Sequence, residues 1–545
     1  MMMGDMDKID RISDLPEFIL HIILSIIDTK EAFRASVLSK KWYRVWSSIP
    51  VLDFNIKYFK KVKDIDPFYF GGGSRYDYIY DDRTVERFLG FIDTTMERYL
   101  AQNYRITKLD IVLPYADEET ELLVDKWIGI AVQNQIQELN INFLDEVEYE
   151  LPEILFRAKS LKVLMCKFVN LGYYDTMDLV SLDSLTLDGG TLDEDMLQKI
   201  ISLSPLVKLC ITHWDLGKIS LPWTRKVCKG AECVGSGTMR YNLKIAPLKE
   251  FVYYGLGSTS PWAWNMNVSA LQNLRKLKIV AANITDDIVS EMANGLVALE
   301  SLELTSCSML KCVKISSISL KEFRIEEVRE ESHLIKITID TPNLLEFWCS
   351  CDVEACLSLI RAQDHCNTCF LLPWVKSITS VWFVKLKKFL IETNCFKSLV
   401  VDLGSFEQFD IDEDLLRIIG ITGITGITGS PYKLRELKLR ESKDGFLPSS
   451  FMAFLDALFW SCNPDVLSIR FRNRSPKDIV DYLKSKVQCW KHPLKKIEVE
   501  GVDCSSLLSE PSEFEFRFKL SWFSVSVNLN AMTTLAWEPS TLMEQ

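Results

Sequence analysis

The N-terminal fold is decided by two stretches, DRISDLPEFILHIILSII at residues 10–27 and SVLSKKW at residues 36–42. Pro16 suits the first turn of a helix, because its fixed φ and missing N–H cost nothing there. We therefore expect a helix from about Pro16 to Ile27. A helix this short and this apolar needs both a small core of its own and a partner surface. Its apolar side chains form two faces, Ile19, Leu20, Ile23, Leu24 and Ile27 on one and Phe18, Ile22 and Ile26 on the other.

Two further short helices follow. Thr29 is the predicted N-cap of a second helix, which ends near Leu38. Ser39 is the predicted N-cap of a third helix. Trp42 and Trp46 stand one turn apart on the same face of the third helix. Three short helices in under fifty residues make a core that is marginal alone. Large aromatic side chains exposed on such a unit predict an obligate interface.

These stretches, with Trp46, Pro50, Leu52 and Phe54 after them, resemble the F-box of plant F-box/LRR-repeat proteins, a group that includes the F-box/FBD/LRR proteins. Lys41 stands where that pattern has Arg, and Phe18 where it has an acidic residue. The resemblance implies that the helices dock on a Skp-type adaptor, which in turn binds a cullin. The residues that would make this contact are Leu15, Pro16, Ile19, Leu20, Ile23, Leu24, Val37, Leu38, Trp42 and Trp46.

The rest of the chain repeats a short L-x-x-L-x-L pattern, mostly every 20 to 30 residues, which is the period of leucine-rich repeats. Each copy predicts one short strand, and the copies must stack because no single repeat can bury its apolar face. We therefore predict an α/β fold, a three-helix F-box followed by an irregular leucine-rich-repeat solenoid shaped as a horseshoe. The clearest copies are residues 106–111, 136–141, 182–187, 274–279, 299–304 and 434–439, and weaker ones centre on Leu164, Leu209, Phe251, Phe323, Phe347, Leu467 and Ile497.

These patterns predict the domain organisation. Residues 494–501 resemble the core of the FBD module that ends many proteins of this group. The expected segments are a disordered start (1–8), the F-box (9–55), a linker or cap (56–103), the solenoid (104–503) with insertions near 217–247 and 420–430, and a divergent C-terminal segment (504–545).

Composition restricts the location and the partners. The net charge of −12 does not favour a polyanion, so we expect no nucleic-acid partner. Residues 1–11 lack the apolar stretch of a secretory signal, and the apolar run 18–27 is too short to span a bilayer. The 15 cysteines form no short disulfide-rich module. We therefore expect a cytoplasmic or nuclear protein with reduced thiols and no membrane partner.

One group of residues has the composition of a zinc site. Cys366 and Cys369 have the C-x-x-C spacing that lets two thiolates hold one tetrahedral ion. Cysteines are also small and apolar enough to fill the interior of a repeat. We favour this packing role over zinc binding, and we expect no metal and no cofactor. We identify no catalytic residue, because the five histidines lie in no metalloprotease, nucleophile-elbow or P-loop motif. The full candidate set is Cys349, Cys351, Cys356, His365, Cys366 and Cys369.

The resemblance implies a non-catalytic subunit of an SCF-type (Skp–cullin–F-box) ubiquitin ligase, in which the F-box holds the scaffold and the repeats bind a protein substrate. The alternative is a small-molecule co-receptor of the hormone-receptor kind. In each predicted strand the residue between two inward apolar positions points to the concave face. We expect this row to be Asp110, Asn140, Met165, Thr186, Cys210, Lys278, Glu303, Arg324, Lys438, Ser468 and Glu498, with substrate contacts at Lys278, Glu303, Arg324 and Lys438.

Overall fold

A computed structural model of the chain provides the fold. It describes residues 12, 15–27, 29–59, 80–144, 149–172, 174–189, 194–212, 248–254, 271–282, 284–326, 334–361, 365–372, 375–402, 406–410, 431–440, 451–472, 494–500 and 513–522. The two insertions expected near 217–247 and 420–430 lie outside these residues. The chain divides into two compact units: unit 1 comprises residues 1–324, 338–344 and 360–362, and unit 2 comprises residues 325–337, 345–359 and 363–545.

Unit 1 begins with three short helices, α1 (Glu17–Ile26), α2 (Thr29–Ser36) and α3 (Lys40–Trp46). The predicted cap of the third helix is confirmed, since Ser39 Oγ accepts a hydrogen bond from the Trp42 amide. The cap predicted at Thr29 is wrong. Thr29 is the first residue of α2, and its buried hydroxyl instead accepts the Asp53 amide, 2.7 Å away. This bond ties α2 to the strand that follows α3.

That strand, β1 (Val51–Asn55), is the first strand of a parallel sheet, because it pairs in register with β2. Eight further strands follow, and each pairs with the next from β2 to β9. They are β2 (Lys108–Leu113), β3 (Glu138–Phe143), β4 (Val163–Lys167), β5 (Ser184–Asp188), β6 (Lys208–Thr212), β7 (Glu250–Tyr254), β8 (Lys276–Val280) and β9 (Ser301–Thr305).

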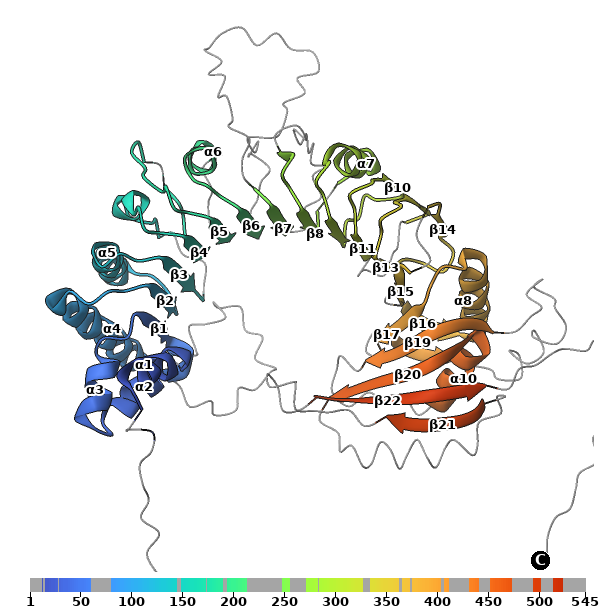
Figure 1. Cartoon of the computed structure of the whole chain (residues 1–545), viewed down its shortest axis with the longest axis horizontal. Helices are drawn as coiled ribbons and strands as arrows, with labels where there is room; N and C mark the ends of the chain where they lie inside the picture. Colours follow the sequence, from blue (N-terminus) through green and yellow to red (C-terminus); the bar gives the residue numbers. More distant parts are fainter. Residues whose placement is uncertain are drawn as a thin grey trace, which may run out of the picture. The chain divides into compact units, whose positions relative to one another are not determined.

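Helices cover one face of this sheet. In Figure 1, α5, α6 and α7 lie on the outer side of the strands of unit 1. The alternating leucines of the repeats point toward these helices and are buried, as at Leu109, Leu139 and Leu185. The side chains between them point to the other side, which we call the open face. The remaining elements of unit 1 are η1 (Ile56–Phe59), α4 (Asp82–Gln102), α5 (Glu118–Gln133), η2 (Glu153–Arg157), α6 (Glu194–Leu203), α7 (Asp286–Gly295) and β10 (Cys312–Ser316).

Unit 2 has a parallel run that ends antiparallel. Strands β13, β15, β17, β19 and β20 pair in parallel, β22 pairs antiparallel with both β20 and β21, and β16 pairs with β18. The bounds are β13 (Glu346–Ser350), β14 (Cys356–Leu359), β15 (Asn367–Leu371), β16 (Val375–Thr379), α8 (Ser380–Thr393), β17 (Ser398–Asp402), β18 (Phe406–Asp410), β19 (Tyr432–Arg440), α10 (Phe451–Ser461), β20 (Cys462–Arg472), β21 (Leu494–Glu500) and β22 (Glu513–Trp522). Strands β11 (Glu322–Glu326) and β12 (Lys336–Asp340) span the division between the units.

These elements agree with the predicted fold class, three N-terminal helices followed by the parallel strands of a repeat solenoid. Within the described ranges, no helix has the length and apolar character that crossing a membrane requires.

Candidate functional site

The ten residues predicted to contact a partner fall into three groups in the structure. Pro16, Val37 and Leu38 are exposed, while Leu15, Ile19 and Ile23 are half-buried. The exposure predicted for the two tryptophans is wrong, because Trp42 and Trp46 keep only 5% and 3% of their surface. The other two predicted contact residues, Leu20 and Leu24, are buried as well.

Other apolar side chains of the three helices are the exposed ones. Phe18, Ile22 and Ile26 lie four residues apart, so they share one face of α1. The sequence analysis recognised this second face but placed the contact on the first. Monomeric proteins rarely expose a run of large apolar side chains, so this face is a candidate interaction site. The exposed fractions are 64% for Phe18, 54% for Ile22, 77% for Ile26, 77% for Val37 and 69% for Leu38.

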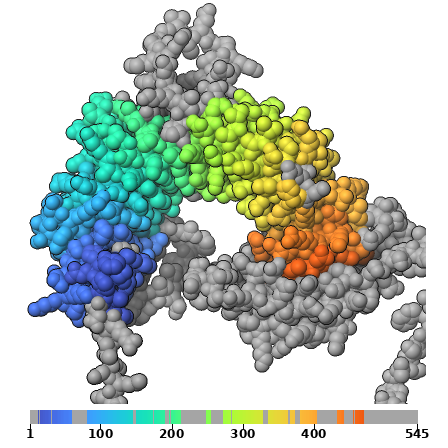
Figure 2. Space-filling view, viewed as in Figure 1, coloured from blue at the N-terminus to red at the C-terminus, as the bar shows by residue number. Residues whose placement is uncertain are grey.

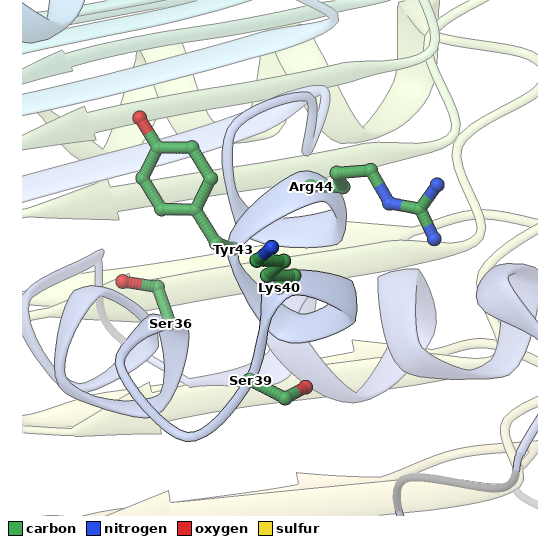
Figure 3. A pocket seen from close by; sticks show the side chains of 5 residues that line it. All are labelled: Ser36, Ser39, Lys40, Tyr43 and Arg44. Carbon is green, nitrogen blue, oxygen red and sulfur yellow. The ribbon is translucent and has the colours of Figure 1, made fainter.

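A shallow pocket of about 680 Å³ lies beside the turn that carries Val37 and Leu38. Figure 3 shows its lining, which comes from the end of α2 and from α3. Two of the lining side chains are basic, and Arg44 forms an exposed ion pair with Glu17 of α1 at 3.2 Å. The three helices therefore present apolar side chains next to positive charge. The lining residues are Ser36, Ser39, Lys40, Tyr43 and Arg44.

Helix α4 covers the tryptophan side of the three helices. The Arg98 guanidinium lies 3.9 Å from the centre of the Trp46 ring, and Phe91 packs edge-on against both Phe33 and Phe54. Burial lowers the pKa of Arg98, but an arginine stays charged at neutral pH. In Figure 2 the dark-blue residues of the three helices adjoin the lighter-blue residues that follow them. The three helices are thus packed onto the first strands of the repeats.

The open face of unit 1 carries the predicted central row of side chains. The register aligns Asp110, Asn140, Met165, Thr186 and Cys210 on successive strands, which confirms this part of the row. The row continues with Lys278 on β8, which lies opposite Glu303 on β9. The sequence analysis missed two members, Asp53 on β1 and Val252 on β7.

The four predicted substrate-contact residues are divided between the two units. Lys278 and Glu303 form an ion pair at 2.7 Å, whereas Lys438 lies in unit 2 and pairs with Glu436 at 3.2 Å. Burial alone would lower the pKa of Lys278, but the hydrogen bond and charge of Glu303 outweigh it and raise the pKa. Arg324 is half-buried and close enough for its charge to act on Lys278.

The candidate zinc residues are divided between the interior and the surface of unit 2. Cys349 and Cys351 are buried, with their sulfur atoms 3.6 Å apart, and Cys366 and Cys369 are also buried. Cys356 and His365 are exposed. Among the residues that the structure describes, no three His, Cys, Asp or Glu side chains gather in a way that could hold a metal ion.

Comparison with known proteins identifies both parts of the chain. A family model described as the F-box domain matches residues 12–54, which include α1, α2, α3 and most of β1. The chain contains an F-box. A second model, described as the At1g61320/AtMIF1 LRR domain, matches residues 261–387. An F-box is thus followed in this chain by leucine-rich repeats, as the sequence resemblance implied.

Two curated relatives from Arabidopsis thaliana have the same two parts in their names. The chain is 28% identical over 208 residues to F-box/LRR-repeat protein At3g03360, an alignment that covers 36% of this chain and 37% of the relative. It is 30% identical over 198 residues to F-box/FBD/LRR-repeat protein At5g56420, which covers 35% of this chain and 41% of the relative. The chain spans less than half the length of the curated relatives that it matches.

Proposed function

We propose that this chain is a substrate-recognition adaptor of an SCF-type ubiquitin ligase, with the F-box docked on a Skp-type adaptor and the repeats bound to a protein substrate. The observation that carries the proposal is the exposed apolar face of the F-box, formed by Phe18, Ile22, Ile26, Val37 and Leu38. A partner that covers these side chains removes a large apolar area from water, which is the main driving force of association.

The proposed contact set differs from the one expected from sequence. The proposed set keeps the exposed residues Pro16, Val37 and Leu38. It also keeps the accessible edges of three half-buried residues, Leu15, Ile19 and Ile23. Leu20, Leu24, Trp42 and Trp46 support the surface from beneath, because they fill the core of the F-box. Phe18, Ile22 and Ile26 are added.

The pocket beside Val37 and Leu38 indicates what the adaptor surface carries there. Lys40 and Arg44 line it together with the Tyr43 ring. An acidic side chain at the rim of an apolar adaptor surface would complement this pocket, and such pairing sets orientation and partner choice more than affinity.

Catalysis in this proposal belongs to other subunits. The chain contributes proximity, because holding a substrate next to the charged ubiquitin carrier raises its effective concentration. The substrate contacts expected at Lys278, Glu303, Arg324 and Lys438 remain predictions. The small-molecule alternative needs several basic side chains that converge on one ligand. On the described open face of unit 1, Lys167, Lys208 and Lys278 each pair with a carboxylate, so these three lysines are already matched within the chain.

Co-expression with a Skp-type adaptor tests the proposal. Val37→Asp with Leu38→Asp places two charges in the proposed interface, while Trp42 and the rest of the core stay intact. Losing two interface anchors costs about 2 to 4 kcal/mol each, so the affinity for the adaptor should fall about 1,000-fold or more and little complex should co-purify. The matched control is Leu122→Asp, an equally exposed leucine on α5, which should leave the complex intact. Undiminished co-purification of the double variant would refute the docking assignment.

A further inference from the structure

The open face of unit 1 has an apolar centre on four adjacent strands. Met165 on β4, Thr186 on β5, Cys210 on β6 and Val252 on β7 stand side by side in register. Met165 is 40% exposed, and the other three are half-buried. We call these four residues the central band. Neighbouring strands are about 4.8 Å apart, so the band is about 14 Å long.

The charged residues on both sides of the central band neutralise one another. Lys167 pairs with Asp188 at 3.4 Å on the side toward the strand ends. Lys208 pairs with Glu250 at 3.3 Å on the side toward the strand starts. Each strand from β4 to β7 places three side chains on the open face. These twelve side chains carry two positive and two negative charges, and all four charges belong to these two ion pairs.

The next pair along the row supports one edge of the band. Lys278 on β8 pairs with Glu303, and its ammonium group lies 5.9 Å from the centre of the Tyr254 ring. Tyr254 occupies the face position of β7 next to Val252. A methionine and a tyrosine around small uncharged residues have the composition of an interface core, where charged residues are depleted.

We infer that the central band binds a short apolar segment of the protein substrate that carries no net charge. This inference rests on the proposed function and deepens it. A band of this size holds only two or three partner side chains, so it provides the anchoring contact of a larger interface. The neighbouring ion pairs exclude a strongly charged segment, because such a segment would have to break a matched pair or leave its own charges unmatched.

Peptide display on the full chain in complex with its Skp-type adaptor tests this inference. A random library of 12-residue peptides is selected on the complex, and the affinity of the enriched peptides is measured by fluorescence polarisation. We expect enrichment of peptides that are rich in Leu, Ile, Met and Phe and near zero net charge. Met165→Glu should weaken their binding at least about tenfold, as the loss of an anchor does.

The control is Leu122→Glu on α5, which should bind these peptides as the wild-type chain does. The inference is overturned if no peptide is enriched, if the enriched peptides share a net charge of one sign, or if Met165→Glu binds them undiminished. A dimer of the complex that Met165→Glu dissociates would also overturn it, because the occupant would then be a second copy of this chain. Adaptor co-purification is scored in each variant, so failure at the band is distinguished from failure of the F-box proposal.

Discussion

The Tyr99 hydroxyl donates a hydrogen bond to the backbone carbonyl of Ile49, 2.6 Å away and fifty residues earlier in the chain. Tyr99 is fully buried, and its pKa is raised by that burial, so the hydroxyl stays protonated and remains a donor. This bond joins α4 to the segment between α3 and β1. Together with Arg98 over Trp46, it fixes the F-box against the first repeats.

Tyr99→Phe should loosen this junction, because it leaves the Ile49 carbonyl without its donor in a buried site. The expected loss of stability is about 1 to 3 kcal/mol. Peptide-resolved hydrogen exchange should show faster opening of α3 and α4 together. Tyr104→Phe is the control, since that ring packs edge-on against Tyr99 and is only half-buried. Equal exchange in the Tyr99 variant and the wild type would contradict the proposed role of the bond.

A pH-dependent contribution is expected at the start of α5. Asp117 caps this helix by accepting the Thr120 amide at 2.9 Å, and hydrogen bonds from Thr120 hold the pKa of Asp117 below its ordinary 3.8. A lowered folded-state pKa stabilises the fold above the ordinary value, and this stabilisation is lost as the pH falls through the lowered pKa. Asp117→Ala should cost about 1 kcal/mol at pH 7.

The difference between wild type and Asp117→Ala should shrink as the pH falls below about 4. Hydrogen exchange of a peptide from α5, recorded for both proteins at each pH, measures this difference in stability. Asp117→Asn keeps an acceptor without a titrating group, so its cap should change little with pH. A wild-type advantage over Asp117→Ala that is constant from pH 7 to pH 3 would show that the carboxylate is not the source.

Thiol labelling should separate the cysteines by burial. Cys312 and Cys356 are exposed, whereas Cys166 and Cys462 are buried, and burial raises the pKa of each of these two to about 12. The thiolate is the reactive form, so N-ethylmaleimide should modify the exposed pair much faster than the buried pair. Mass spectrometry of time points measures each site. Similar rates at Cys312 and Cys166 would mean that β4 is not packed as described.

Metal analysis addresses the cysteines of unit 2. The protein purified without added metal should contain far less than one equivalent of zinc, and Cys366→Ser should not change that content. Stoichiometric zinc that is lost in Cys366→Ser would establish a metal site and refute the packing interpretation.

The sequence predicts the repeat strands well wherever the L-x-x-L-x-L pattern is complete. Residues 274–279 and 299–304 correspond to β8 and β9, because alternating apolar residues have one face to bury. Strand β1 was not recognised as part of the sheet, since Leu52 and Phe54 were already accounted for within the F-box resemblance. Strand β22 was also missed, although Phe514, Phe516, Phe518 and Leu520 alternate, because it is antiparallel and lies beyond the last repeat.

The exposed face of the F-box was harder to predict than its fold. The helix expected from about Pro16 to Ile27 corresponds to α1, Glu17–Ile26, but its pattern leaves two apolar faces to choose between. The burial of Trp46 depends on α4, which begins at Asp82 and covers the tryptophan side through Phe91 and Arg98. A contact so distant along the chain leaves no mark on the local pattern of residues 16–46.

Site-specific photo-crosslinking in the co-expressed complex tests the central claim most directly. A photoreactive phenylalanine analogue is placed at Ile22, at Val37 or, as a control, at Leu122, all three exposed in unit 1. The proposed docking predicts crosslinks to the Skp-type adaptor from positions 22 and 37 and none from position 122. Crosslinks that are absent at 22 and 37, or equally strong at 122, would contradict it.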